Sequence, residues 1–247
     1  MRIGILGASG LVGTCLVQLI LDSPGLELAA ALVSPGSRLA GTPVAGGGIE
    51  YRPADAEMNS HCDVMIDFST PAASLSLQAQ IAKKNIPTVI GTTGFSAKDD
   101  ATLTGWCAHR PMLISANFAR GFEAFRLASL GYARMMPDAE PRVFETYHAR
   151  KKADPSGTSK LLAAEISKTR STAMGFEAPE TPITVKREGD IVGINEVSFD
   201  LGSAETRFTY RVHTRAAYAE GALAAAQWLV ATPRPAGRYT LADSLEG

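Results

Sequence analysis

In the first half of the chain, short apolar runs alternate with helical stretches, and this alternation predicts a parallel β-sheet with connecting helices. Pro24-Gly25 follows the first helical stretch and ends it. Strands are expected at 2–6, 26–33, 64–68, 87–90 and 112–115. Helices are expected at 10–21, 72–84 and 98–108.

The second half has a different rhythm, because its strands alternate polar with apolar residues and predict a second, α+β domain. Gly202-Ser203-Ala204-Glu205 is a hairpin signal. Strands are expected at 142–147, 183–187, 195–201 and 207–213, and helices at 121–136, 158–170 and 216–230. The last helix is Ala-rich and resembles those of the first half, so the chain is expected to return there. The predicted domains are therefore 1–117 with 216–247, and 118–215.

Composition excludes several classes of protein. The 247 residues are enough for a real core, and the net charge of −1 gives no basic field for nucleic acid. Three cysteines without a CxxC pair favour a reducing compartment over a disulfide framework or a structural zinc site. No apolar run reaches the ~18 residues of a membrane span. The regular glycines near the N-terminus, without an A-x-A-like cleavage site, argue against a signal peptide, so a cytoplasmic protein is expected.

A glycine-rich turn follows the first expected strand. Gly7, Gly10 and Gly13 have G-x-x-G-x-x-G spacing, with Leu11 and Val12 between the last two. Glycine lets the backbone turn tightly and approach a pyrophosphate, while the helix N-terminus presents N–H groups to the anion. The alternative is a tight turn without a ligand. The repeated strand–helix context favours a dinucleotide site.

The end of the second expected strand bears on the choice of nucleotide. An NAD site expects an acidic residue there to accept hydrogen bonds from the ribose 2′-hydroxyl. The sequence has none, and offers Ser34 and Arg38, which suit a 2′-phosphate. NADPH is therefore favoured, with NADH also possible, against the alternative of a solvated arginine.

The remaining strand ends carry small polar residues and aromatic rings. In an open parallel sheet, ligands bind beyond the carboxyl ends of the strands. Phe68 or Phe118 is a candidate to pack on a nicotinamide face, although ordinary turn chemistry explains each segment singly. The candidates at this edge are Phe68, Ser69, Gly91, Thr92, Thr93, Ser115, Asn117 and Phe118.

The stretch ETYHARKKADPSGTSK, residues 145–160, combines one histidine, a basic run and a helix start. Ser156, Gly157 and Thr158 precede a helical stretch and form a candidate carboxylate site, or a plain N-cap. Lys151 is suited to donate a proton or hold an anion, although many basic loops are only solvated. His148 is a candidate acid, base or hydrogen-bond donor, or a structural histidine.

These segments together resemble the dihydrodipicolinate reductase family, also called the 4-hydroxy-tetrahydrodipicolinate reductases. The resemblance covers essentially the whole chain. It rests on GASGLVG (7–13), DVMIDFSTP (63–71), VIGTTGF (89–95), SANFARG (115–121), E-x-x-H-x-x-K…PSGT (145–158), REGDIVG (187–193) and RAAYAEGAL (215–223).

The resemblance implies a Rossmann domain plus a smaller mixed-sheet domain for substrate binding and oligomerisation, usually in a homotetramer. It implies NAD(P)H-dependent reduction of a cyclic unsaturated imine dicarboxylate in lysine and diaminopimelate biosynthesis. At matching positions, Lys151 would be the proton donor, and Gly157 and Thr158 would hold a substrate carboxylate. His148 would contact the substrate, and Arg215 belongs to the cofactor side. No metal is implied.

The sequence departs from the family pattern at several positions. Tyr147 stands where a histidine is usual, and Asn195 stands where another is usual. Smaller departures are Leu11, Ala119-Arg120 and the order Ala153-Asp154. A phenol has an unperturbed pKa near ~10, so it donates a hydrogen bond but seldom cycles protons at neutral pH. Either Tyr147 stabilises developing charge beside Lys151, or the pocket serves another substrate.

Three functions therefore stay open from the sequence. The leading one is the lysine-pathway reductase, with Lys151, His148 and Tyr147 as catalytic candidates. The second is a reductase for a related small cyclic carboxylated imine, since a fold and its motifs do not fix the substrate. The third is a non-catalytic NADPH-binding regulatory protein, which has no need of a proton donor.

Overall fold

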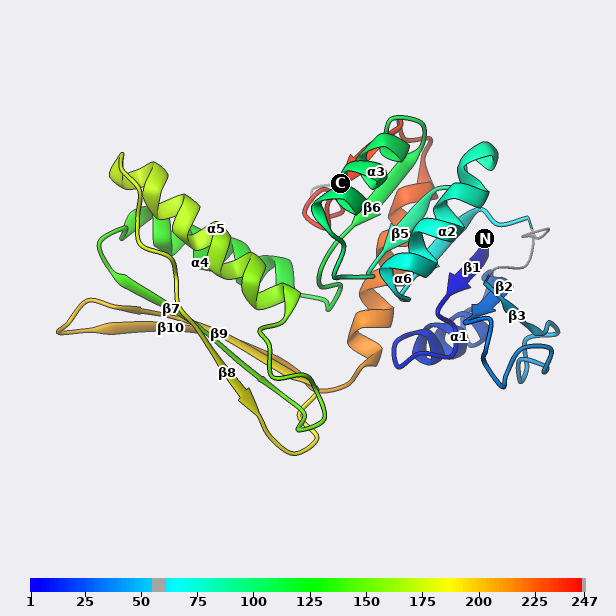
Figure 1. The fold of residues 1–247 in the computed structure, drawn as a ribbon, viewed down its shortest axis with the longest axis horizontal. Coiled ribbons are helices and arrows are strands. Elements are labelled where there is room, and N and C mark those ends of the chain that lie inside the picture. The colour runs from blue at the N-terminus through cyan, green and yellow to red at the C-terminus, as the bar shows by residue number, and fades with distance from the viewer. Residues whose placement is uncertain (55–60, 246–247) are drawn as a thin grey trace. The chain divides into compact units, whose positions relative to one another are not determined.

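The computed structural model describes residues 1–54 and 61–245 and consists of two compact units (Figure 1). Unit 1 contains Met1–Ala119 and Arg215–Gly247, and unit 2 contains Arg120–Thr214. The chain thus leaves unit 1 once and returns to it. Each unit has its own buried apolar core, and each is described below by itself.

Unit 1 is built on a seven-stranded sheet in which every pair of neighbouring strands is parallel. The order is β11-β6-β5-β4-β1-β2-β3, which is the doubly wound Rossmann order with one strand added at the β6 edge. The strands are β1 (Arg2–Leu6), β2 (Glu27–Val33), β3 (Tyr51–Pro53), β4 (Val64–Asp67), β5 (Thr88–Ile90), β6 (Pro111–Ile114) and β11 (Gly237–Tyr239). The predicted parallel sheet is confirmed.

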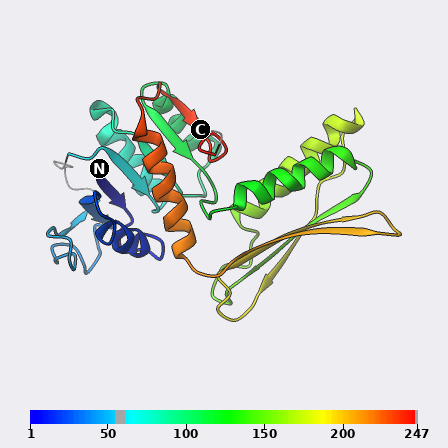
Figure 2. The same cartoon turned by 180° about the vertical axis from the view of Figure 1, so that it is seen from behind.

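Helices cover both faces of this sheet. On one face lie α2 (Pro71–Ile81), which continues into the short η1 (Ala82–Lys84), and α3 (Ala97–Cys107); the other face carries α1 (Gly13–Leu21) and α6 (Ala216–Ala231) (Figures 1 and 2). Small residues of α6 are buried against α1 and the central strands, as the Ala-rich sequence predicts. This layered arrangement leaves the carboxyl ends of the strands as the edge where ligands bind in such folds.

Unit 2 is a four-stranded mixed sheet with two helices. The sheet order is β10-β9-β7-β8, and only the β7–β8 pair is parallel. Phenylalanines of α4, apolar residues of α5 and alternate strand residues form one core. The elements are α4 (Phe122–Met135), β7 (Glu140–Tyr147), α5 (Gly157–Met174), β8 (Ile183–Arg187), β9 (Gly193–Asp200) and β10 (Glu205–Val212). The α/β fold class with a smaller mixed-sheet part is confirmed.

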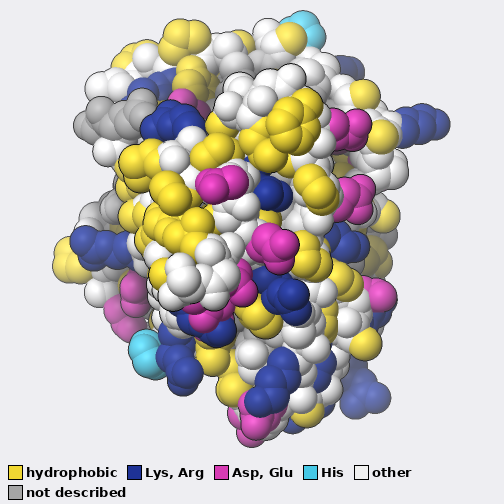
Figure 3. Space-filling model, turned by 90° about the vertical axis from the view of Figure 1, so that its left-hand side faces the viewer, with side chains coloured by type: hydrophobic (Ala, Val, Ile, Leu, Met, Phe, Trp, Pro, Cys, Tyr) yellow, Lys and Arg dark blue, Asp and Glu magenta, His cyan; other side chains and the backbone are white. Residues whose placement is uncertain are grey.

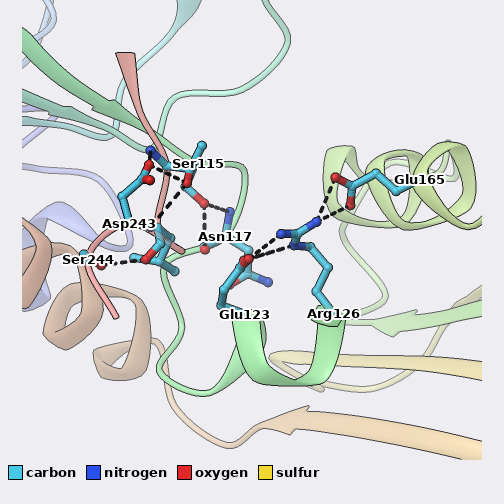
Figure 4. A network of polar contacts seen from close by, with 9 residues as sticks. Ser115, Asn117, Glu123, Arg126, Glu165, Asp243 and Ser244 are labelled. Carbon is cyan, nitrogen blue, oxygen red and sulfur yellow. Dashed lines mark hydrogen bonds and ion pairs between the residues drawn. The ribbon is translucent and has the colours of Figure 1, made fainter. Parts of the chain in front are cut away.

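A buried ion triad joins the two helices of unit 2. Arg126 of α4 donates to Glu123 one turn earlier and, through Nη1 at 2.8 Å, to both oxygens of Glu165 on α5 (Figure 4). The Arg126 side chain is only 16% exposed, and the hydrogen bonds from the guanidinium to Glu123 are the main cause of its raised pKa. The triad fixes the approach of α4 to α5 and therefore the place of the α5 N-terminus.

Two short strands were not expected from the sequence. β3 and β11 have three residues each and lie at opposite edges of the parallel sheet. β3 contains Pro53, which an edge strand tolerates because one side of it pairs with no neighbour. The first helix begins at Gly13 and not at residue 10, because residues 7–12 form the turn that precedes it.

On the surface, charged side chains of both signs are interspersed with hydrophobic ones on the face shown in Figure 3. Among the described residues, no helix is long and apolar enough to cross a membrane. The same residues contain no group of three or more His, Cys, Asp or Glu side chains arranged to hold a metal ion.

Candidate active site

The glycine turn between β1 and α1 leaves backbone N–H groups available to a ligand. The N–H groups of Gly7 and Ala8 both donate to the carbonyl of Leu32, which fastens the turn to the end of β2. No side chain caps α1, and within the described chain the N–H groups of Leu11 and Val12 donate to no other residue. A helix N-terminus of this kind attracts a phosphate.

Two of the glycines are required by close backbone approach. Gly7 has φ of +84°, and a Cβ there would lie 2.3 Å from the carbonyl oxygen of Phe68. A Cβ on Gly13 would lie 2.0 Å from the carbonyl oxygen of Gly7. Glycine therefore lets the turn pack closely on itself and on the end of β4, at the point between β1 and β4 where the strand order reverses and where ligands bind in such folds. These residues fit a dinucleotide.

A buried carboxylate organises the ends of β4 and β5. Asp67 Oδ1 accepts hydrogen bonds from the Ser69 hydroxyl at 2.6 Å and the Thr92 hydroxyl at 2.8 Å. The Ser69 N–H in turn donates to the Thr92 hydroxyl at 2.8 Å. Burial raises the pKa of Asp67 against the effect of these hydrogen bonds. Ser69 and Thr92, predicted as cofactor contacts, are thus engaged with Asp67, which the sequence analysis did not single out.

Phe68 is the half-exposed ring at this edge, and its position is closely constrained. A Cβ on Gly91 would lie 2.3 Å from the Phe68 ring, so only glycine leaves room for it. Phe118 is 1% exposed and meets Phe68 edge to face, with ring centroids 5.7 Å apart. Phe118 therefore supports Phe68 from the core, and Phe68 is the ring that reaches the surface. Thr93, beside them, is exposed.

The other predicted cofactor residues lie in the loops after β6 and β2 and immediately before α6. The Ser115 hydroxyl donates to the carbonyl of Asn117 at 2.9 Å, and the Asn117 amide oxygen accepts from the Ala119 N–H, so both side chains shape the end of the β6 loop (Figure 4). Ser34 and Arg38 are exposed in the loop after β2, and Arg215 is half-buried immediately before α6.

In unit 2, the start of α5 is anchored to a buried carboxylate on β7. Glu145 is 1% exposed, and its Oε2 accepts from the Ser156 N–H at 3.0 Å and from the hydroxyls of Ser156 and Ser159, each at 2.5 Å. Ser156 also caps α5 by accepting from the Ser159 N–H. The N–H and hydroxyl groups of Ser156 are thus occupied by hydrogen bonds within the protein. The N–H groups of Gly157 and Thr158 have no partner among the described residues and remain for a ligand.

Arg187 at the end of β8 fixes the loop that carries Lys151. Its Nη2 donates to Glu145 Oε1 at 2.6 Å and to the carbonyl of Asp154 at 2.9 Å, and its Nε donates to the carbonyl of Lys152 at 2.8 Å. Burial alone would raise the pKa of Glu145, but the hydrogen bonds from Ser156, Ser159 and Arg187 outweigh it and hold that pKa below its ordinary value. The sequence analysis assigned no role to Glu145 or Arg187.

Lys151 lies on the ring of Tyr147. Its Nζ is 3.4 Å from the ring centroid, a cation–π contact. Burial is the main cause of a pKa of Lys151 below the ordinary 10.5, with Glu145 acting to raise it and Arg187 to lower it. A half-buried ammonium with a lowered pKa, in the loop that precedes α5, is suited to donate a proton to a bound substrate. His148 follows directly after β7, is also half-buried, and its carbonyl accepts from the Lys151 N–H.

Two family models match the chain: dihydrodipicolinate reductase, N-terminus, over residues 1–118, and dihydrodipicolinate reductase, C-terminus, over residues 123–245. The chain belongs to the dihydrodipicolinate reductase family. Curated relatives are named 4-hydroxy-tetrahydrodipicolinate reductase. That of Psychrobacter arcticus is 31% identical over 265 residues, covering 99% of this chain and 94% of the relative. That of Acinetobacter baumannii is 32% identical over 264 residues, covering 99% and 96%.

A solved structure shares the fold of this dihydrodipicolinate reductase family member. The dipicolinate-bound dihydrodipicolinate reductase of a Paenisporosarcina species matches with a TM-score of 0.73 over 97% of both chains, at 18% identity. The family resemblance predicted from the sequence motifs is therefore confirmed, and the fold is that of the family.

Tyr147 and Asn195 meet in the structure. The Tyr147 hydroxyl donates to Asn195 Oδ1 at 3.3 Å, and Asn195 Nδ2 donates to the Ser159 hydroxyl at 3.3 Å. Tyr147 and Asn195 are 6% and 2% exposed, so both lie inside unit 2. The tyrosine and the asparagine are thus in direct contact.

Proposed function

We propose that this chain reduces 4-hydroxy-tetrahydrodipicolinate to tetrahydrodipicolinate with a nicotinamide cofactor, in the biosynthesis of lysine and diaminopimelate. One observation carries the proposal: Lys151 and the open N–H groups of α5 are held by one buried network, around Glu145, in a chain that matches the family over its whole length. The curated names of the relatives support the substrate.

In the proposed reaction, residues of unit 1 bind the cofactor, and residues of unit 2 bind the substrate and donate the proton. The glycine turn and the strand ends of unit 1 hold the cofactor, which supplies the hydride when bound. In unit 2, the N–H groups of Gly157 and Thr158 bind a carboxylate of the substrate, and His148 contacts the ring. Lys151 Nζ donates the proton that accompanies hydride addition, and the 4-hydroxyl group of the substrate leaves as water. The buried hydrogen bonds around Glu145 keep these groups in place before substrate arrives.

NADPH is the proposed preferred cofactor. The loop after β2 carries the exposed Ser34 and Arg38, and residues 32–38 contain no carboxylate side chain that would favour NADH. Arg38→Ala is expected to raise the KM for NADPH about 10-fold, the loss typical of one charge-assisted hydrogen bond, and to leave the KM for NADH unchanged. Steady-state oxidation of each cofactor, with substrate made by the preceding synthase, measures both. An equal effect on NADH would contradict the assignment to the 2′-phosphate.

The carboxylate site is tested by removing a single N–H group. Gly157 is the first residue of α5 and follows the extended Ser156, so proline is compatible with the backbone there. Gly157→Pro is expected to weaken dipicolinate binding about 10-fold or more, because a hydrogen bond to a charged group is lost. Gly157→Ala keeps the N–H group and is the matched control. Isothermal titration compares the three proteins, and equal affinities would place the carboxylate elsewhere.

We further propose that the chain acts in the cytoplasm as a homotetramer assembled through the sheet of unit 2. The helices α4 and α5 pack on one face of this sheet. Arg142, Phe144 and Arg207 lie on strands of this sheet that border a hollow of about 560 Å³, which also reaches Arg170 and Met174 of α5. Light scattering that gives the mass of a single chain would contradict the tetramer.

A related small cyclic carboxylated imine is the second candidate substrate. The contact between Tyr147 and Asn195 favours it, because both positions depart from the family's usual residues and lie beside the α5 N-terminus. Faster turnover of another cyclic imine than of the synthase product would establish this second function. NADPH binding without reduction of any imine would indicate a regulatory protein.

A further inference from the structure

The ring of Tyr147 supports the lysine proposed as the proton donor. Lys151 Nζ lies 3.4 Å from the ring centroid, and the Lys151 side chain forms no ion pair with any residue the structure describes. Arg187 also lies over this ring, but farther away, with its central carbon 5.7 Å from the centroid. The face of the ring is therefore in direct contact with the Lys151 ammonium.

The ring is held in place through its hydroxyl. The Tyr147 O–H donates to Asn195 Oδ1, Asn195 Nδ2 donates to the Ser159 hydroxyl, and that hydroxyl donates to Glu145. All four side chains are at least nine-tenths buried. The last acceptor in this series of hydrogen bonds is the Glu145 carboxylate, which also accepts a hydrogen bond from Arg187. The phenol hydroxyl thus donates to an amide oxygen of the protein itself.

We propose that Tyr147 is a positioning residue and not a proton donor: its ring holds the Lys151 ammonium, and Asn195 locks that ring to the first turn of α5. This inference rests on the proposed function, because it gives Lys151 the only proton-donating role of the pair. A histidine at this position could not hold the ammonium in the same way, because the imidazole ring is smaller and carries polar nitrogen atoms at its edge.

The charges around Lys151 set the direction of the pH effect. Glu145 on β7 favours the ammonium, Arg187 on β8 disfavours it, and the Tyr147 ring face favours it. Removing the ring while keeping the volume filled should therefore lower the pKa of Lys151 further. The fraction of enzyme able to donate a proton would then fall at a lower pH than in the wild type.

Two substitutions separate the ring from its hydroxyl. Tyr147→Phe keeps the ring but loses the hydrogen bond to Asn195, so we expect a loss of kcat clearly smaller than that of Tyr147→Met and the same alkaline limb in the pH profile. Tyr147→Met fills the space without a π face, and we expect kcat to fall about 10- to 100-fold, as misplaced groups do. The alkaline limb should move to lower pH by about half to one unit. If Tyr147→Phe loses as much activity as Tyr147→Met, the hydroxyl is the functional group and the proposal is wrong.

A second measurement reports on the contact in the wild-type protein and needs no turnover. The chain has eight lysines, so ¹³C labelling gives a short set of ε-methylene signals, and Lys151→Arg identifies the one that matters. A methylene beside an ammonium seated on an aromatic face resonates upfield through the ring current. An ordinary Lys151 signal would overturn the proposal even if the enzyme is active. An upfield signal without turnover would leave the contact standing and refute the proposed function.

Discussion

Replacing Lys151 with methionine is expected to lower kcat by about 10²- to 10⁴-fold, the contribution typical of a general acid. The side chain is half-buried beside Tyr147, and no other lysine lies on this ring in the part of the chain that the structure describes. Methionine keeps most of the length of the lysine side chain but has no ammonium group to donate a proton. Steady-state kinetics with the synthase product measures the loss.

The neighbouring lysine supplies the control for this variant. Lys152 is exposed, and only its backbone carbonyl is used, as an acceptor for Arg187. Lys152→Met should therefore keep kcat within about twofold, and the Kd for NADPH should be unchanged in both variants. In the wild type, kcat should fall as the pH rises through the pKa of Lys151, which burial places below 10.5. Equal losses in the two variants would contradict the assignment.

Replacing Glu145 with glutamine is expected to lower the free energy of unfolding of unit 2 by about 3 kcal/mol, because it leaves a largely buried arginine without its partner. Arg187 is 12% exposed and the Glu145 side chain 0% exposed, so water can replace little of the lost contact. Glutamine also disturbs the hydroxyl donors Ser156 and Ser159. Because these residues hold the α5 start and the Lys151 loop, substrate binding should weaken as well.

The stabilising effect of Glu145 should depend on pH in a defined direction. Its pKa is lowered in the folded state, so its contribution is complete above the ordinary value of 4.5 and is lost as the pH falls through the lowered value. Urea unfolding of the wild type and Glu145→Gln should therefore differ most near pH 7 and converge in acid. Glu188→Gln, which breaks an exposed pair with Lys186, should cost less than about 1 kcal/mol. A difference independent of pH would refute the role given to the carboxylate.

Local signals were enough to predict part of the site. The glycine turn, the Ser156-Gly157-Thr158 helix start and the strand-end loops are each encoded by consecutive residues. What the sequence analysis missed depends on strand pairing. Glu145 and Arg187 are 42 residues apart, and Asp67 and Thr92 are 25 apart. Their contacts follow from the β7–β8 and β4–β5 registers, which no local pattern specifies.

Tyr147 shows the same limit at a single side chain. The sequence identified it as an unexpected residue but gave no orientation for it. The antiparallel pairing of β7 with β9 brings Asn195 opposite Glu145 and within reach of the Tyr147 hydroxyl, 48 residues away along the chain. The contact between Tyr147 and Asn195 could therefore be recognised only in the folded chain.

The central claim is that this chain reduces the product of the lysine-pathway synthase. The most direct measurement is NADPH oxidation by the purified wild-type chain when that synthase generates the substrate in the same cuvette, with a synthase-free reaction as the blank. The account predicts oxidation that depends on both proteins, in a 1:1 ratio to the substrate formed. Tight NADPH binding with no oxidation above the blank would contradict it.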